Sequence, residues 1–133
     1  MNKKILIVSS NYYKNISNNL ELGSTNLLKE NNFDYNIINA PGCFEIPLLI
    51  KKNIRKYLGF IALGCIIKGD TYHFEVIANE TTRKIMDLSV DNNVPIGFGV
   101  LTCYDLNQAK LRSEINEQNK GREAALACIE LLK

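Results

Sequence analysis

Short runs of apolar residues alternate along the chain with longer stretches in which apolar residues recur every three or four positions. Residues 5–8 (Ile-Leu-Ile-Val) show no polar alternation, which is typical of a strand that is covered on both faces. Three other segments are also predicted to be strands, of which 59–63 has the same buried character. The predicted strands are 5–8, 33–38, 59–63 and 96–101.

Helical periodicity fills the intervals between these strands. Ile16, Leu20, Gly23 and Leu27 fall on one stripe of a first helix, for which Asn15 is the predicted N-cap. A second helix is predicted over 48–57, with Pro47 near its first turn. The stripes of the last two helices are Phe74, Ile77, Ala78, Thr81, Ile85 and Leu88, and then Ala124, Ala127, Cys128 and Leu131.

The resulting order of elements is βαβαβαβα. Strands that alternate with helices predict right-handed parallel crossovers, and therefore an α/β fold: a three-layer sandwich with a four-stranded parallel sheet and helices on both faces. Such sheets bind ligands at the carboxyl ends of their strands. The segments at those ends are 9–15, 40–45, 64–73 and 102–105.

Composition and charge narrow the class of protein. The 133 residues are 46% hydrophobic and 23% charged, which fits one globular domain, residues 1–133, and excludes a disordered chain. A net charge of +2 without a sustained basic run gives no indication of nucleic-acid binding. No stretch approaches the roughly 20 apolar residues of a membrane span, and the apolar run at 5–8 is too short for a secretory signal. We therefore expect a cytoplasmic protein without a nucleic-acid or membrane partner.

Cysteine usage agrees with that location. The four cysteines lie far apart without a C-x-x-C pair, and one histidine leaves little from which to build a zinc site. Apolar neighbours predict that the cysteines are reduced and mostly buried. They are Cys43, Cys65, Cys103 and Cys128.

The segment 64–73 is the richest in candidate chemistry. Gly69, Asp70 and Thr71 directly precede a predicted helix, whose free N–H groups favour an anion. By local sequence alone, Thr71 as a simple helix cap is the more common arrangement. Gly64 and Gly69 have P-loop spacing, but Asp70 stands where that motif needs lysine, which argues against nucleotide triphosphate binding. His73, the only histidine, is either a proton carrier beside this loop or an exposed residue without a role.

Other candidates flank the same end of the predicted sheet. In segment 40–47, Phe44 offers an apolar surface and Glu45 a carboxylate at a helix start, whereas Cys43 lacks a second histidine that would make it a nucleophile. Further along the chain, Arg112 and Lys120 are cations that can hold a phosphate or simply face solvent. Tyr12 and Tyr13 can stack on a planar ring or cover the sheet edge.

Four segments in register resemble the 6,7-dimethyl-8-ribityllumazine synthase family over nearly the whole chain. They are 41–47 (PGCFEIP), 62–75 (ALGCIIKGDTYHFE), 98–102 (FGVLT) and 119–125 (NKGREAA). The resemblance implies condensation of 5-amino-6-(D-ribitylamino)uracil with 3,4-dihydroxy-2-butanone 4-phosphate, without a metal or redox cofactor. It also implies a homo-oligomer whose active sites lie between adjacent subunits.

The resemblance assigns roles to individual residues. It makes His73 the proton donor, Tyr12 the ring that stacks on the pyrimidine, and Phe98 a ring that closes over it from the neighbouring subunit. Asp70, Thr71 and Arg112 would hold the phosphate of the butanone, and Lys120 lies in a matched segment. The pocket for the uracil and ribityl groups would be lined by Cys43, Phe44, Glu45, Cys65, Ile66 and Ile67.

Departures from the family pattern are few. Tyr12 replaces a usual Phe, Lys68 a usual Arg, and Cys43 a usual small residue. Segment 113–118 lacks the glycines that shell-forming members commonly have there, which predicts a pentamer rather than an icosahedral shell.

Two other functions fit the same layered fold. One is a flavodoxin-like binding or signalling module, but residues 8–11 lack the clustered acids of a receiver domain, and residues 12–14 lack the hydroxyl- and glycine-rich loop of a flavin carrier. The other is a family member that binds a lumazine or flavin without catalysis. The joint presence of His73, Thr71 and Arg112 argues against this second alternative.

Overall fold

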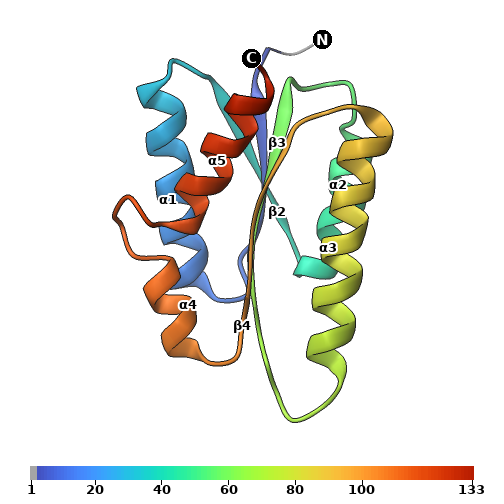
Figure 1. The fold of residues 1–133 in the computed structure, drawn as a ribbon, viewed down its shortest axis with the longest axis vertical. Helices are drawn as coiled ribbons and strands as arrows, with labels where there is room; N and C mark the ends of the chain where they lie inside the picture. Colours follow the sequence, from blue (N-terminus) through green and yellow to red (C-terminus); the bar gives the residue numbers. More distant parts are fainter. Residues whose placement is uncertain (1–2) are drawn as a thin grey trace.

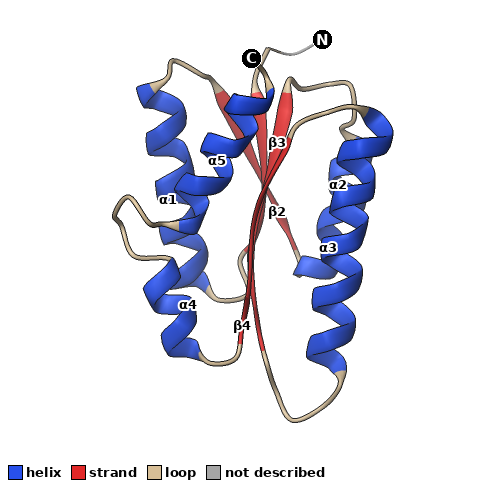
Figure 2. Cartoon of the chain, in the orientation of Figure 1, coloured by secondary structure: helices blue, strands red, loops and turns tan. Residues whose placement is uncertain are grey.

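Among residues 3–133, which the computed structural model describes, four parallel strands form a sheet between two layers of helices (Figures 1 and 2). The strands are β1 (Ile5–Ser10), β2 (Tyr35–Ala40), β3 (Gly59–Ile67) and β4 (Ile96–Cys103). Their order in the sheet is β2-β1-β3-β4, so β4 is an edge strand. The predicted three-layer α/β architecture, with a parallel sheet and the flavodoxin-like arrangement of layers, is confirmed.

The helices divide between the two faces of the sheet. Helices α1, α4 and α5 lie on one side, and α2 and α3 lie on the other (Figure 2). Their bounds are α1 (Lys14–Glu30), α2 (Ile46–Lys52), α3 (His73–Asn92), α4 (Leu106–Arg112) and α5 (Lys120–Leu131), with a 3-10 turn, η1 (Cys43–Glu45), before α2.

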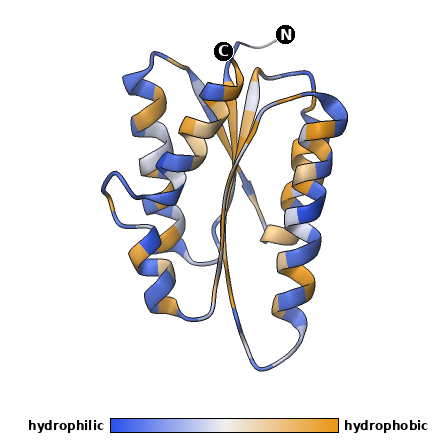
Figure 3. Cartoon of the chain, in the orientation of Figure 1, coloured by the Kyte–Doolittle hydropathy of each residue, from blue (hydrophilic) through white to orange (hydrophobic). Residues whose placement is uncertain are grey.

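A separate apolar core fills each side of the sheet. Ile5 and Ile7 of β1 pack toward α1 and α5, and Leu6 and Val8 pack toward α2 and α3. Every residue of β1 is therefore buried, which explains why its sequence lacks polar alternation. The hydrophobic colouring of the strands and of the inward helix faces follows the same arrangement (Figure 3).

The bounds of all four strands differ from the predicted ones; β1, for example, continues to Ser10 instead of ending at residue 8. Strand β3 continues to Ile67 because its last residues pair with β4, as in Cys65 with Leu101, so β4 also extends to Cys103. Strand β2 begins at Tyr35, because the Phe33 N–H donates to the Leu28 carbonyl where α1 ends. The loop between β3 and α3 is consequently shorter than segment 64–73.

Helix α1 begins one residue before the predicted N-cap. Asn15 lies inside the helix, and Tyr13 takes the cap position without a side-chain hydrogen bond. The start is held instead by Ser17, whose N–H donates to the Tyr13 carbonyl and whose Oγ donates to the Ser10 carbonyl at 2.5 Å. The predicted stripe of α1 is buried as expected.

Helix α2 is shorter than the predicted 48–57. It ends at Lys52, where the Asn53 side chain donates to the Leu49 carbonyl at 2.8 Å. Arg55 then has a φ of 69°, a left-handed conformation that a right-handed helix cannot contain.

Helix α4 was not predicted, although its sequence carries a signal. Asp105 Oδ1 accepts from the Gln108 N–H at 2.8 Å, while Gln108 Oε1 accepts from the Tyr104 N–H at 2.8 Å. The arrangement is a variant of the capping box, because Gln108 accepts from the N–H of the residue before the cap and not from that of Asp105 itself. The Asp-x-x-Gln spacing at 105–108 therefore indicated a helix start.

The closing stripe was partly wrong. Ala124 and Cys128 are buried, but Ala127 is exposed and Leu131 is 64% exposed. The helix also buries Gly121, Ala125 and Ile129, because α5 packs against α1 as well as against β4.

Candidate active site

A cavity of about 600 Å³ lies at the carboxyl ends of β1 and β3. Nine of the residues named from the sequence line it: Tyr12, Cys43, Phe44, Glu45, Cys65, Ile66, Ile67, Thr71 and His73. They come from the segment after β1, the turn η1, the end of β3 and the start of α3. The parallel sheet thus brings together four segments that are far apart in the sequence, at the edge where such sheets bind ligands.

Several lining residues were not named as site residues. They are Ser10, Tyr13, Pro41, Gly42, Gly69, Phe74 and Ile77. Ile77 was detectable, because it lies one turn after His73 and therefore on the same helix face. The others adjoin named residues and line the cavity through their position in the same loops.

The floor of the cavity requires a glycine in β3. A Cβ on Gly64 would lie 2.6 Å from Cys43 Sγ and 3.4 Å from Ser10 Cβ, so a side chain here would push η1 away from the sheet. Gly64 therefore allows Cys43 to pack directly against the strand.

Tyr12 presents an exposed ring at the mouth of the cavity. Its side chain is 75% exposed, and its ring meets that of Tyr13 edge-to-face, with centroids 5.0 Å apart. Tyr13 is partly buried, and this burial raises the pKa of its phenol. The inner ring supports the outer one in an orientation that leaves the Tyr12 face open to a planar molecule.

His73 is the first residue of α3, and its exposed side chain lines the cavity. Tyr72 takes the N-cap position without a side-chain hydrogen bond, and Thr71 Oγ1 accepts only a long bond of 3.4 Å from the His73 N–H. Thr71 therefore does not take the N-cap position, although its hydroxyl accepts this one weak bond at the helix start. The start of this 20-residue helix instead presents backbone N–H groups, which favour a bound anion.

Asp70 does not line the cavity, although Gly69 and Thr71 on either side of it do. The structure thus does not bring Asp70, which the family resemblance assigned to the phosphate, into the cavity, and no carboxylate of this loop faces an anion there. The loop contributes its backbone and the Thr71 hydroxyl to the cavity.

A small cluster ties this loop to the end of β4. Lys68 Nζ lies 5.6 Å from the centroid of the Tyr104 ring and 3.9 Å from Glu75 Oε1, and the rings of Phe74 and Tyr104 are 6.2 Å apart. Both charges are partly exposed, so the ion pair contributes little energy. The cation and the ring nevertheless position the loop that precedes His73.

The cavity thiols are poor nucleophiles. Burial raises the pKa of the Cys43 thiol, and burial raises the pKa of Cys65 to about 12. Because the thiolate is the reactive form, neither residue has the activated character of a catalytic cysteine. The cysteines outside the cavity, Cys103 and Cys128, are also free and buried, as the sequence predicted.

We expect native protein to resist alkylation by iodoacetamide at pH 7.5, whereas protein in denaturant reacts at all four cysteines. Burial raises the pKa of all four thiols, to about 12 for Cys128, so very little thiolate exists at this pH. Intact-mass spectrometry over time measures the labelling. Rapid labelling of Cys103 or Cys128 in folded protein would contradict this account, since neither lines the cavity.

Phe98, Arg112 and Lys120 do not line this cavity within one chain. Phe98 lies on the edge strand β4 and is 41% exposed; its neighbours Gly97 and Gly99 face α5, so its ring lies on the opposite side of the sheet. Arg112 is the exposed last residue of α4, and its Nη1 donates to the Gln108 carbonyl at 3.3 Å.

Lys120 begins α5, with its Nζ 3.2 Å from Glu123 Oε1. With Phe98 and Arg112, it belongs to the side of the molecule formed by β4 and the elements that follow it.

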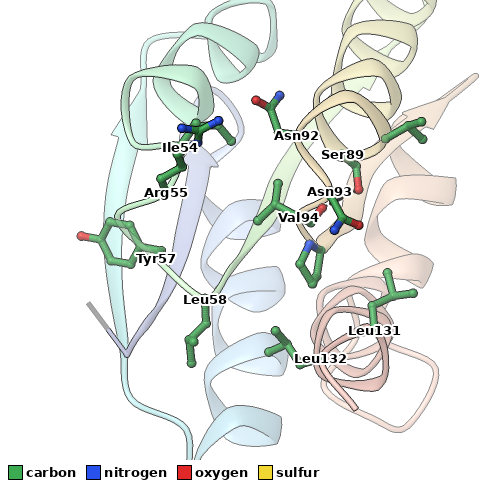
Figure 4. Close-up of a pocket in the computed structure, with 12 residues that line it drawn as sticks. Ile54, Arg55, Tyr57, Leu58, Ser89, Asn92, Asn93, Val94, Leu131 and Leu132 are labelled. Atoms are coloured by element: carbon green, nitrogen blue, oxygen red, sulfur yellow. Dashed lines mark hydrogen bonds between the residues drawn. The ribbon is translucent and has the colours of Figure 1, made fainter. Parts of the chain in front are cut away.

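The largest cavity lies at the opposite end of the sheet. It has a volume of about 710 Å³ and is formed by the connections before β3 and β4 and by the end of α5 (Figure 4). Its only charged lining residue is Arg55, and it contains no histidine or carboxylate. A third hollow of about 610 Å³ lies between α2 and α3 and includes only Phe44 of the named residues. Size alone therefore does not identify the active site.

Two further classes of site were searched for in residues 3–133. No group of three or more His, Cys, Asp or Glu side chains is arranged to hold a metal ion. None of the helices in this part of the chain combines the length and apolar character needed to cross a membrane.

Comparison with known proteins gives a consistent result. Residues 2–133 match the model of a family described as 6,7-dimethyl-8-ribityllumazine synthase. A protein of that name from Bartonella tribocorum is 42% identical, over all of this chain and 93% of its own length. Proteins of the same name from Bartonella bacilliformis (41%, all of this chain and 92% of its own length) and Agrobacterium fabrum (38%, 97% and 94%) are similar.

Proposed function

We propose that this chain, which belongs to the 6,7-dimethyl-8-ribityllumazine synthase family, uses His73 as its proton carrier in a cavity that a second copy of the chain completes. The enzyme is a transferase. It joins 5-amino-6-(D-ribitylamino)uracil to 3,4-dihydroxy-2-butanone 4-phosphate and releases water and inorganic phosphate. The product, 6,7-dimethyl-8-ribityllumazine, arises in the penultimate step of riboflavin biosynthesis.

The observation that carries the proposal is the composition of one cavity. It holds the only histidine of the chain, the start of α3 and the exposed rings of Tyr12 and Phe44. An aromatic face, an anion-binding helix start and an imidazole are the groups that a planar pyrimidine, a phosphate and a sequence of proton transfers require.

The pyrimidine substrate takes the side of the cavity formed by β1, η1 and β3. Tyr12 stacks on the uracil ring, and the exposed Glu45 carboxylate accepts hydrogen bonds from hydroxyl groups of the ribityl chain. Cys43, Phe44, Cys65, Ile66 and Ile67 complete the wall of this pocket.

The phosphate of the butanone binds where Gly69 and Thr71 lead into α3. Backbone N–H groups and the Thr71 hydroxyl donate to its oxygens, and the Asp70 side chain stays outside the cavity. Arg112 adds a guanidinium, whose planar fork matches phosphate geometry. Lys120 adds a second positive charge at the same mouth.

Catalysis follows from orientation and proton transfer. The amine of the pyrimidine attacks the ketone, and loss of a first water gives an imine. Phosphate then departs, and attack of the second nitrogen of the pyrimidine closes the ring with loss of a second water, which completes the lumazine. His73 accepts and returns the protons of these steps, while Arg112 neutralises the departing phosphate. No protein nucleophile is needed, which is compatible with the raised pKa values of Cys43 and Cys65.

A second copy completes this site. Phe98, Arg112 and Lys120 lie outside the cavity of their own chain, on the side that carries the free edge of β4. Bringing that side against the cavity mouth of the next copy closes Phe98 over the pyrimidine and delivers Arg112 to the phosphate. The interface is head-to-tail, and repetition of such an interface gives a ring when its rotation closes.

The proposal is tested by mixing purified protein with both substrates and recording the fluorescence of the lumazine. Product should appear only when both substrates and the protein are present. The dephosphorylated ketone is the control, and it should react far more slowly because phosphate is the leaving group. Tight binding of the lumazine without turnover would overturn the proposal and favour a non-catalytic binding protein.

We expect a ring of five copies in solution, with a mass of about 75 kDa from chains of 15.0 kDa. The basis is segment 113–118, which lacks the glycines of shell-forming family members. Light scattering coupled to size-exclusion chromatography measures the mass. A particle of about 900 kDa, corresponding to sixty copies, would contradict the pentamer, and an active monomer would contradict the shared site.

We further propose that the whole chain, residues 1–133, acts as one domain and that it works in the cytoplasm. The four free cysteines suit a reducing compartment.

A further inference from the structure

The most extensively bonded side chain in the interior is an amide that the proposed mechanism does not use. Asn119 is only 1% exposed and lies between the end of α4, the start of α5 and α1. Its Nδ2 lies within 3.1 Å of the carbonyl oxygens of Asn19, Ser113 and Glu114. Its Oδ1 accepts from the Arg122 N–H at 3.0 Å.

These bonds connect three separate parts of the chain. Ser113 and Glu114 directly follow Arg112, so the amide holds the backbone at the point where α4 ends. The bond to Arg122 caps α5, whose first residue is Lys120. The bond to Asn19 anchors both ends of the segment to α1, across 100 residues of sequence.

The surrounding structure leaves room for this amide only because of a glycine. A Cβ on Gly23 of α1 would overlap the Asn119 carboxamide. Gly121 lies two residues after Asn119 in the sequence, and a Cβ at this position would likewise overlap the Leu20 backbone. The two helices therefore approach closely at this crossing, and the amide sits inside the contact.

The segment that the amide closes is otherwise exposed. Residues 114–118 all face solvent, whereas Ser113 and Asn119 at its two ends are buried. Packing against the sheet and α1 holds the two helices, but inside the segment only local turns accompany the amide. The amide is the side chain that joins the end of α4 directly to the start of α5.

We propose that Asn119 is the positioning residue that sets Arg112 and Lys120 in a fixed mutual geometry, so that both cations reach the same phosphate. This inference rests on the proposed function, because it assumes that these two side chains meet the phosphorylated substrate. Asn119 itself touches no substrate. Its role is to hold the two backbone segments from which the cations extend.

The test compares N119S with S24A. Serine keeps a short oxygen that can cap α5 but lacks the amide that binds the three carbonyls. Ser24 is the matched control, because its Oγ donates to the Gly121 carbonyl at 2.7 Å and so joins α1 to α5 without touching segment 113–119. Both variants weaken the same helix crossing, and thermal unfolding establishes that both remain folded at the assay temperature.

Two readouts separate positioning from stability. We expect N119S to raise KM for the butanone phosphate roughly 10-fold, with KM for the pyrimidine unchanged, and S24A to change neither. Hydrogen exchange of amides in residues 112–120 should accelerate in N119S and not in S24A. Unchanged exchange in N119S, or kinetics equal to those of S24A, would overturn the inference.

Failure of the proposed function has a different signature. Wild-type protein that forms no lumazine removes the basis of the proposed function, and the inference then falls with it. Wild-type protein that forms lumazine, with R112A raising KM for the butanone phosphate, supports the proposed function whatever N119S does. If R112A raises this KM and N119S leaves it unchanged, the result contradicts only the positioning role of Asn119 and leaves the proposed function intact.

Discussion

Replacing His73 with alanine will lower kcat for lumazine formation by about 10²- to 10⁴-fold, the range that a positioned proton carrier contributes. His73 is the only imidazole of the chain, and it lies in the cavity beside the start of α3. Its side chain is exposed and is not part of the hydrophobic core, so the variant should fold and assemble as the wild type does. Stopped-flow or steady-state fluorescence of the product measures the loss.

Two controls make this result specific. N79A changes an exposed residue of the same helix that lines none of the cavities described above, and it should retain full activity. Imidazole added to the solution should partly restore turnover in H73A. The missing side chain lies at the open mouth of the cavity, so a free imidazole molecule can enter and take its place. An H73A variant with wild-type kcat would exclude His73 from the mechanism.

Much of this fold could be predicted because the two central strands, β1 and β3, are covered on both faces. The uninterrupted apolar run of β1 follows from burial of all its residues, and that pattern is visible in the sequence. The stripe of α1 is also visible, since the apolar residues at its helical spacing, Ile16, Leu20 and Leu27, face one core.

The errors have different physical origins, and the error in β3 comes from contacts between distant segments. Strand β3 runs past Gly64 because β4 supplies partners for Cys65 to Ile67, and no local pattern reveals that pairing. Helix α2 stops at Lys52, whereas helical periodicity continued through Tyr57, because Arg55 takes a left-handed conformation. Helix α4 is the exception: its capping signal was local and was overlooked.

Prediction of the site follows the same division. Residues that line the cavity, such as Thr71 and His73, lie where segments directly follow strands, and this position can be read from the order of elements. Phe98 and Arg112 do not line that cavity, and nothing in the sequence alone says which copy of the chain they serve. Asn119 escaped notice because its partners are carbonyl groups, which every residue has.

The shared site leads to a second large effect, which appears when two defective proteins are combined. R112A alone should raise KM for the butanone phosphate about 10- to 100-fold, as loss of a charge-assisted phosphate contact does. When R112A and H73A chains are assembled into mixed rings, about a quarter of the active sites should again be complete. A cavity with intact His73 then meets a neighbour with intact Arg112 at about one interface in four of a randomly mixed ring. Activity of the co-purified mixture at a ketone concentration near the wild-type KM measures this recovery.

A second mixture distinguishes a site shared between two chains from a site within one chain. Wild-type protein co-assembled with the H73A/R112A double variant contains the same numbers of intact His73 and Arg112 side chains as the first mixture. If the two residues serve one site across an interface, both mixtures should reach about a quarter of wild-type activity, because each random pairing is intact one time in four. If they act within one chain, the first mixture stays near the residual activity of its components and the second rises to about half. Since Arg112 lies outside the cavity that holds His73, we expect the two mixtures to agree, and a twofold or larger excess of the second over the first would place the complete site within a single copy.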